Sequence, residues 1–295
     1  RLILRLLRNN IIPIFVFDGK PPPEKEEILM ERRLKKEFMH MKKEIYELII
    51  KFKDFPIDVV TNLINMYIKK HNQLFKIDQE HIHDMKNKSV EEIREEIDKI
   101  NRKIINIKSA HIQSAKELFR LFGISYIDTD CEAESMLAFM NKNNMIDACI
   151  TEDMDILAGG GKIFLKNFSA DKNIVDEYCL EGILETLELT HDEFIDLCIL
   201  SGCDYTPKIG GMGSLSAYKL VKKYKKIENI LPEIRTNGKY IVPENFNYQD
   251  ARRLFHSTFD MQILKSVLPV KLREPNLKEL LLFLDKTSLH VKYKH

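Results

Sequence analysis

The chain has 295 residues, of which 44% are hydrophobic and 31% charged, and its formal net charge is +1. This length suits one elaborated domain or two smaller ones. No apolar run approaches the roughly 20 residues that a bilayer-spanning helix needs, which excludes such a helix within this sequence. The near-neutral total hides local blocks of both signs, so an anionic partner is not excluded.

The cysteine pattern favours reduced thiols over disulfides or zinc, because the five cysteines are odd in number and include no C-x-x-C pair. We expect buried thiols in a reducing intracellular compartment, the nucleus if the organism is eukaryotic. The chain begins at Arg1 without an initiator Met or a signal peptide, and we expect a fragment. The five cysteines of the chain are Cys131, Cys149, Cys179, Cys198 and Cys203.

The first 23 residues predict a helix and then a strand. Residues 1–8 form the second half of an amphipathic helix, and the continuously apolar residues 11–17 are typical of a fully buried strand. Asp18 follows at the carboxyl end of this strand, and the prolines at 21–23 stop any regular structure.

Residues 24–123 predict charged helices. One helix is expected over residues 24–53 and another over 57–76, with a break near Pro56. A long helix is expected from Ser89 until Gly123, because its apolar residues keep a spacing of three to four. The middle of this region is too polar for a core, so we expect a projecting arm or hairpin.

The next segment alternates strands and helices. Strands are expected at 124–127, 148–150 and 162–165, and Thr190 with Glu193 forms a capping box for an apolar helix. This alternation predicts an α/β fold with a mostly parallel central sheet and helices on both faces.

Acidic residues follow three of the predicted strands and the apolar helix. Because parallel strands end at one edge of a sheet, these acids should converge there. If residues 151–155 are extended, Asp153 and Asp155 point the same way. So many carboxylates repel one another unless divalent cations neutralise them, which predicts a site for two hard cations; the alternative is a crevice rim of solvated acids. The acids are Asp18, Glu132, Glu134, Asp153, Asp155 and Asp204.

A glycine-rich turn at residues 207–213 precedes a helix that we expect Ser214 to cap. Several lysines and no acids lie between Tyr205 and Ile227. Backbone N–H groups at a helix N-terminus bind phosphate, and lysines extend such an anion surface. The alternative is a tight turn followed by a solvated lysine face. Together, the acids and the turn suggest metal-assisted phosphodiester hydrolysis on a nucleic acid.

Several motifs resemble, in order, those of the flap endonuclease branch of the XPG-type structure-specific nucleases. They are Phe-Val-Phe-Asp-Gly-Lys-Pro-Pro at 15–22, Glu-Ala-Glu at 132–134, Thr-Glu-Asp-Met-Asp at 151–155, Leu-Cys-Ile-Leu-Ser-Gly-Cys-Asp-Tyr at 197–205 and Gly-Met-Gly at 211–213. Residues 240–245 and 274–276 are also similar to segments of that family. The resemblance implies a PIN-like nuclease core in residues 1–23 and 111–204, a helical arch in 24–110 with a long insertion, and a helix–two-turn–helix DNA-binding module with a C-terminal helical region in 205–295.

The resemblance also implies the chemistry of the site. Two Mg²⁺ ions, replaceable by Mn²⁺, are held by the six acids named above. Lys25 and Arg32 match residues that reach the scissile phosphate; seven positions apart, they share one helix face. The Gly211–Gly213 hairpin grips duplex DNA with a bound K⁺. The resemblance implies DNA contacts for Glu132, Gly202, Asp204, Gly211 and Gly213. We expect Lys219, Lys222 and Lys223, on the helix after the hairpin, to extend this DNA-binding surface.

The function implied is a 5′ flap endonuclease that cuts branched DNA in replication and repair. A 5′→3′ exonuclease or junction-cutting relative, and a non-catalytic DNA-binding scaffold, are the alternatives. We expect a monomer, and the sequence shows no clear motif for binding a sliding clamp.

Three features depart from the family pattern. The family's N-terminal strand, with its own metal-ligating Asp, has no counterpart here, which would leave the metal site one ligand short. The arm between about residues 34 and 99 is longer than the family's arch. Leu215 and Ser216 stand where basic residues usually follow the hairpin glycines.

Overall fold

The computed structural model describes residues 1–71, 83–85, 87–169, 174–236, 238–261, 264 and 272–286. The chain divides into two compact units. One combines Arg1–Glu26 with Ala110–His295, and the other is Glu27–Ser109. Among the described residues, no helix combines the length and the apolar character needed to cross a bilayer.

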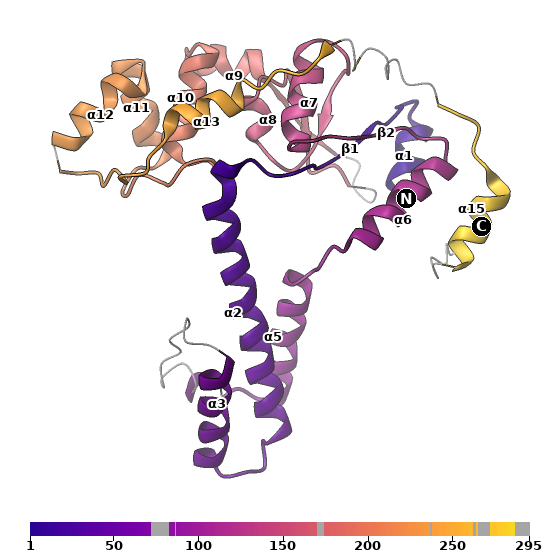
Figure 1. Ribbon diagram of the computed structural model, residues 1–295, viewed down its shortest axis with the longest axis vertical. Helices are drawn as coiled ribbons and strands as arrows, with labels where there is room; N and C mark the ends of the chain where they lie inside the picture. Colours follow the sequence, from indigo (N-terminus) through magenta and orange to yellow (C-terminus); the bar gives the residue numbers. More distant parts are fainter. Residues whose placement is uncertain are drawn as a thin grey trace. The chain divides into compact units, whose positions relative to one another are not determined.

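The larger unit sets short strands among many helices, consistent with the predicted α/β class (Figure 1). Its elements are α1 (Leu2–Arg8), β1 (Phe15–Phe17), the 3₁₀ helix η1 (Pro23–Lys25), α6 (Ser109–Leu121), β2 (Tyr126–Asp128), α7 (Ala133–Lys142), β3 (Cys149–Ile150), α8 (Asp155–Ala158), β4 (Ile163–Lys166), β5 (Asp176–Cys179), α9 (Leu180–Leu187), α10 (His191–Ser201), α11 (Ser214–Tyr224), α12 (Ile227–Thr236), α13 (Tyr248–Phe255) and α15 (Leu277–Lys286).

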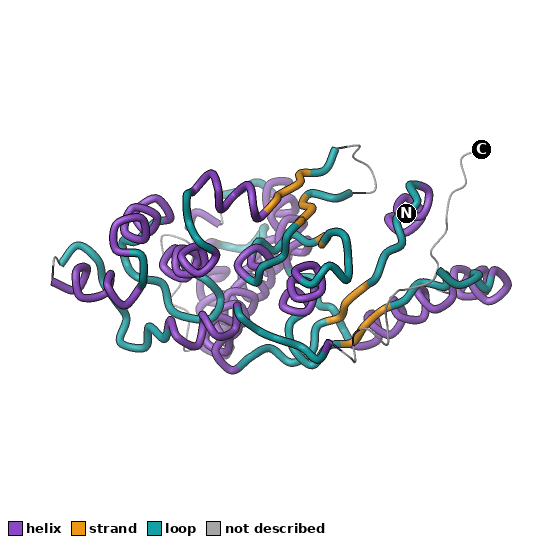
Figure 2. The backbone as a smooth tube through the Cα atoms, turned by 90° about the horizontal axis from the view of Figure 1, so that it is seen from above, coloured by secondary structure: helices purple, strands orange, loops and turns teal. Residues whose placement is uncertain are grey.

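The described strands form two small sheets, drawn in orange in Figure 2. In the first, β1 and β2 are parallel, with Phe17 opposite Asp128. In the second, β3 and β4 are parallel and β5 is antiparallel to β4. The parallel arrangement is as predicted, but β5 is a strand that the sequence analysis does not predict. Its first two residues are exposed acids, as an edge strand tolerates, so the apolar signal of a strand is weak there.

The predicted strand at 11–17 is wrong in its first half. Ile11 and Ile12 are 43% and 52% exposed, and only Phe15–Phe17 form strand. Asn10 takes a left-handed conformation (φ 59°) at the end of α1, and Pro13 has no N–H to donate to a ladder. An apolar run therefore identified the strand but not where it begins.

The central helix of the larger unit is α10. Its capping box is present as predicted: the Glu193 N–H donates to Thr190 Oγ1 at 3.2 Å, and the Thr190 N–H donates to Glu193 Oε2 at 3.1 Å. Ile195 and Ile199 are fully buried, and the helix packs against α8, α11 and α13. It therefore connects the segment after β3 with the helices that follow residue 205.

The single helix predicted from Ser89 to Phe122 is two helices. The first, α5 (Val90–Lys103), begins with a Ser89–Glu92 capping box and ends at Ile104, whose backbone is not helical (φ −93°, ψ 53°). Ile105 and Ile107 are 69% and 74% exposed in the connection to α6. The apolar spacing continues across the break because each of the two helices packs its apolar face into a different core. Periodicity alone does not show which core an apolar face packs into.

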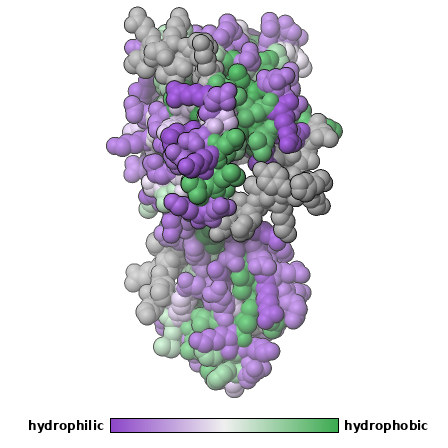
Figure 3. Space-filling view, turned by 90° about the vertical axis from the view of Figure 1, so that its right-hand side faces the viewer, coloured by the Kyte–Doolittle hydropathy of each residue, from purple (hydrophilic) through white to green (hydrophobic). Residues whose placement is uncertain are grey.

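The smaller unit contains α2 (Glu26–Lys51), α3 (Ile57–His71) and α5. The prediction that this region is too polar for a core is wrong, because Ile45, Tyr46, Ile64 and Ile93 are fully buried together. Hydrophilic side chains cover much of the face drawn in Figure 3, with hydrophobic ones visible between them. Charged and apolar residues are about equally frequent in this unit, and the apolar ones form a core because they share the inner faces of the helices.

All five cysteines are free thiols, as predicted. Cys149 and Cys203 are buried, but Cys179 is exposed, contrary to the expectation of buried thiols. Burial raises the pKa of Cys149 to about 12, so this thiol is an unreactive core group.

Candidate active site

Asp18 and Glu132 meet at the N-terminus of α7. Asp18 follows β1, and its Oδ1 accepts a hydrogen bond of 2.8 Å from the N–H of Ala133, the first residue of α7. The positive end of the helix dipole favours carboxylates at this position. Gly19 is required here because a Cβ on it would lie 2.1 Å from the carbonyl oxygen of Thr129.

The segment after β3 is a turn, so the prediction that Asp153 and Asp155 lie on an extended chain is wrong. The N–H of Asp153 donates to Thr151 Oγ1 at 3.1 Å, and the N–H of Asp155 donates to Asp153 Oδ1 at 3.0 Å. Met154 has helical dihedrals and Asp155 begins α8. Short polar side chains that bond to nearby N–H groups favour turns over strands, which explains the difference.

The predicted acids lie close enough to act on one another's charge. Burial, then the charges of Asp153 and Asp204, raise the pKa of Asp155 to about 7. Burial, then the charges of Asp18 and Asp153, raise the pKa of Glu134. The structure therefore brings together the acids from β1, α7, the turn after β3 and the end of α10. We call these six residues the acid cluster.

Lys25 lies inside the acid cluster. Its ammonium group donates to Glu132 Oε1 and lies 3.1 Å from Asp204 Oδ2. Burial alone would lower the pKa of Lys25, but the hydrogen bonds to Glu132 and Asp204 raise it. A cation is thus stable at this position, as expected among carboxylates.

The prediction that Lys25 and Arg32 share one face of a single α-helix is wrong. Lys25 is the last residue of the 3₁₀ helix η1, and α2 starts only at Glu26, so the two residues do not lie on one α-helix. Arg32 lies on α2 within the smaller unit. Its role at the scissile phosphate stays a prediction.

Gly202 and Asp204 are placed by the end of α10. Gly202 has a φ of 108°, and a Cβ on it would lie 2.7 Å from Cε of Lys208. Only glycine adopts this backbone conformation without strain. The turn it permits brings Asp204 beside Lys25.

Two residues near the acid cluster have contacts that the sequence analysis does not assign. The Thr151 hydroxyl orders the turn and lies 3.4 Å from Glu134 Oε1. The Tyr205 hydroxyl donates to Glu132 Oε2 at 2.7 Å. Burial and this hydrogen bond raise the pKa of Tyr205 above its usual range, so the hydroxyl stays protonated. Tyr205 stands in a recognised motif, but only the fold shows what its hydroxyl contacts.

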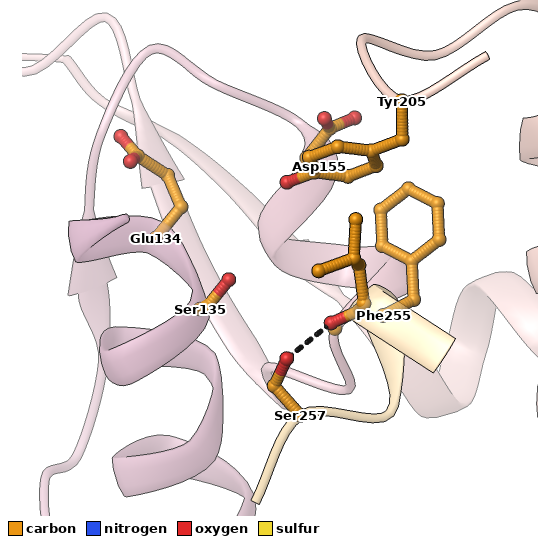
Figure 4. Close-up of a pocket in the computed structure, with 8 residues that line it drawn as sticks. Glu134, Ser135, Asp155, Tyr205, Phe255 and Ser257 are labelled. Atoms are coloured by element: carbon orange, nitrogen blue, oxygen red, sulfur yellow. Dashed lines mark hydrogen bonds between the residues drawn. The ribbon is translucent and has the colours of Figure 1, made fainter. Parts of the chain in front are cut away.

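A small pocket opens beside Asp155 (Figure 4). Glu134 from α7 and Asp155 from α8 line it together with Tyr205, and Phe255 at the end of α13 faces the Tyr205 ring. The full lining is Glu134, Ser135, Asp155, Gly159, Tyr205, Leu254, Phe255 and Ser257.

The donor chemistry of the acid cluster fits hard divalent cations, which prefer carboxylate oxygens. Burial and neighbouring carboxylates raise the pKa values of Asp155 and Glu134, and a divalent cation bound there would favour the ionised forms of both. Within the described ranges, however, no three His, Cys, Asp or Glu side chains converge closely enough to ligate one ion. The residues therefore suit divalent cations by their type and by their proximity to one another.

The glycine hairpin is held by a second segment of chain. Gly210 and Ile241 form an antiparallel bridge with hydrogen bonds of 2.8 and 3.0 Å. Gly211 has a φ of 77°, and Gly213 rather than the predicted Ser214 is the N-cap of α11. Both Gly211 and Gly213 are exposed, which leaves their backbone accessible to a ligand.

The predicted hairpin lysines differ in their surroundings. Lys219 and Lys223 are exposed on α11, and the Lys223 ammonium lies 4.6 Å from the ring centroid of Tyr224. The Lys222 ammonium instead donates to Glu188 Oε2 at 2.6 Å, next to the C-terminus of α9. Lys222 therefore has a structural contact that competes with any phosphate.

Two segments of the chain match domains of one nuclease family. Residues 1–38 match the XPG N-terminal domain, and residues 123–204 match the XPG I-region. The first contains Asp18, Lys25 and Arg32, and the second contains the remaining acids. The six predicted acids, Lys25 and Arg32 therefore fall within the two segments that match XPG domains.

Particular relatives are similar over most of the chain. Flap endonuclease 1 of Aedes aegypti is 39% identical over 255 residues, which cover 85% of this chain and 56% of the relative. The fold resembles flap endonuclease-1 from Methanococcus jannaschii (TM-score 0.59, 22% identity, 97% of this chain and 73% of that one). It also resembles the catalytic core of Rad2 in complex with a DNA substrate (TM-score 0.58, 22% identity, 97% and 77%). The chain spans about half the length of the curated relatives it matches.

Proposed function

We propose that this chain is the nuclease part of a structure-specific 5′ flap endonuclease that hydrolyses phosphodiester bonds in branched DNA. One observation carries the proposal: carboxylates from four separate segments lie close enough to act on one another's charge, and the ammonium group of Lys25 contacts two of them, Glu132 and Asp204. The similarity to flap endonuclease 1 supports the substrate class. A role in DNA replication and repair follows from that class.

The proposal includes two Mg²⁺ ions, replaceable by Mn²⁺, at the acid cluster. Bound divalent ions would supply an activated water and neutralise the charge that develops on the phosphate oxygens. Asp18, Glu132, Glu134, Asp153, Asp155 and Asp204 would hold them. Lys25 and Arg32 would orient the scissile phosphate and stabilise its charge.

The proposal assigns duplex binding to the hairpin and α11. Gly211 and Gly213 offer exposed backbone, Lys219 and Lys223 offer exposed charge, and Gly202 would contact substrate beside the acid cluster. We also expect a K⁺ at the hairpin, action as a monomer, a nuclear location and binding to a sliding clamp. Five free thiols support a reducing compartment.

The test is cleavage of a 5′-labelled flap duplex by the protein expressed from its complete open reading frame, with Mg²⁺ or with EDTA. We expect a cut near the single-strand/duplex junction that EDTA abolishes. A 3′ flap, a nicked duplex and a four-way junction serve as comparison substrates. Preference for the four-way junction would favour a junction-cutting relative, and preference for the nicked duplex would favour an exonuclease. DNA binding without any cleavage would favour the scaffold.

Lys25→Ala and Arg32→Ala test the proposed roles at the phosphate. Each should lower the single-turnover cleavage rate by about a hundredfold, since each would lose charge stabilisation in the transition state. DNA affinity should change by less than about threefold. Lys20→Ala and Arg33→Ala are matched controls, because both are exposed neighbours of the same type. A loss of affinity alone would contradict the assignment.

A further inference from the structure

Tyr205 contacts Glu132, a member of the acid cluster, and Lys25, which lies inside that cluster and comes from a different segment. Its side chain is buried, and its hydroxyl donates to Glu132 Oε2 at 2.7 Å. The Lys25 ammonium lies 5.8 Å from the centroid of the Tyr205 ring, within the range of a cation–π contact. One aromatic side chain therefore touches both partners of the Lys25–Glu132 pair.

The two oxygens of Glu132 are divided between these neighbours. Oε1 accepts from Lys25 and Oε2 accepts from Tyr205. A carboxylate fixed through both oxygens cannot rotate without breaking a hydrogen bond, and partners at this level hold reactive groups in place. Phenylalanine would keep the ring contact but leave Oε2 without this donor.

The Tyr205 ring is held in turn by α13. The ring of Phe255 packs edge-on against it, with centroids 5.2 Å apart and an interplanar angle of 75°. Three residues before Phe255, Arg252 donates to both carboxylate oxygens of Asp196 on α10, at 2.7 and 2.8 Å. The Asp196 side chain is 3% exposed. A buried ion pair of this kind fixes α13 against α10, because breaking it leaves a charge without a partner.

We infer that Tyr205 is a positioning residue that holds Glu132 and, through it, Lys25, and that α13 supports Tyr205 through Phe255. This inference rests on the proposed nuclease function. Although α13 carries no member of the acid cluster, it thereby helps to hold Tyr205 and Glu132 in position.

The experiment measures single-turnover cleavage of the 5′-flap duplex, DNA affinity and thermal stability for Tyr205→Phe and Phe255→Leu. Tyr205→Phe should lower the cleavage rate about tenfold, as expected for one hydrogen bond to a charged group, with DNA affinity within about twofold of wild type. Phe255→Leu should lower the rate about threefold. Tyr218→Phe is the matched control, because its hydroxyl bonds to the Leu187 carbonyl at 3.0 Å, and its rate should not change.

A double-mutant cycle separates positioning from general stability. In the Lys25→Ala background, Tyr205→Phe should change the rate by less than about twofold, since both substitutions remove the same arrangement. Normal cleavage by Tyr205→Phe, or effects of the two substitutions that multiply, would overturn the inference and leave the nuclease function intact. Absence of cleavage by the wild-type protein would overturn the nuclease function and this inference with it.

Discussion

The acid cluster and the glycine hairpin are two regions that both suggest phosphate chemistry, yet they are built differently. In the acid cluster, four of the six acids are partly buried, and Lys25 contacts two of these, Glu132 and Asp204. In the hairpin, the glycines and Lys219 are exposed, and hydrogen bonds between Gly210 and Ile241 fix the backbone. The contrast indicates that the first region depends on the positions of charges, whereas the second depends on their number and on an open backbone.

Asp155→Asn should have the largest effect if position matters in the acid cluster. Loss of this carboxylate should lower the cleavage rate on the order of a thousandfold, because a proposed metal ligand is removed while the volume is kept. Single-turnover kinetics on the flap duplex measure it. Asp147→Asn is the matched control, as this exposed acid precedes β3 and is not a member of the cluster. Equal rates for the two variants would remove Asp155 from the site.

The stability of the protein without divalent ions should depend on pH through Asp155. Its folded pKa of about 7 lies above the unfolded value of about 3.9, so between these values the folded state binds more protons. This group therefore lowers the free energy of unfolding as pH rises from about 4 to 7, by about 2 kcal/mol after allowance for partial exposure. Urea unfolding in EDTA should show that the free energy of unfolding of Asp155→Asn, relative to that of wild type, increases from pH 4.5 to pH 8. A difference that does not vary with pH would contradict this.

Gly202→Ala tests the turn that places Asp204. The φ of 108° and the contact with Lys208 should make the variant less stable by about 2 kcal/mol, measured by urea unfolding. Gly182→Ala is the matched control, because a Cβ there would meet no described atom within 4 Å, and it should be neutral or slightly stabilising. Comparable stability of both variants would show that the turn accommodates a side chain.

The smallest effects are expected at the hairpin lysines, where charge counts more than position. Lys219→Ala should weaken duplex binding a few-fold and reduce the slope of log affinity against log salt by about 0.9, as for one lost phosphate contact. Lys222→Ala should change this slope less, because its ammonium is bonded to Glu188. Fluorescence anisotropy at several salt concentrations measures both slopes. A larger change for Lys222→Ala would reverse this order.

The sequence predicted the helices best where local signals are strong. The capping box at Thr190 and the break near Pro56 depend on neighbouring residues alone, and both are present. The sequence did not predict the features that depend on which distant segments pack together. The apolar face from Ser89 to Phe122 serves two cores, and the polar middle region still assembles a core of its own.

For the candidate site, the sequence by itself determined which acids follow strands and that glycines interrupt the chain at 202 and 211–213, because these are properties of order and residue type. Only the tertiary structure decided that Lys25 lies among the acids and that Lys222 contacts Glu188. It also decided that Tyr205 bonds to Glu132, 73 residues away. The physical reason is that a side chain's charge and shape are encoded locally, whereas its partners are set by packing between distant segments.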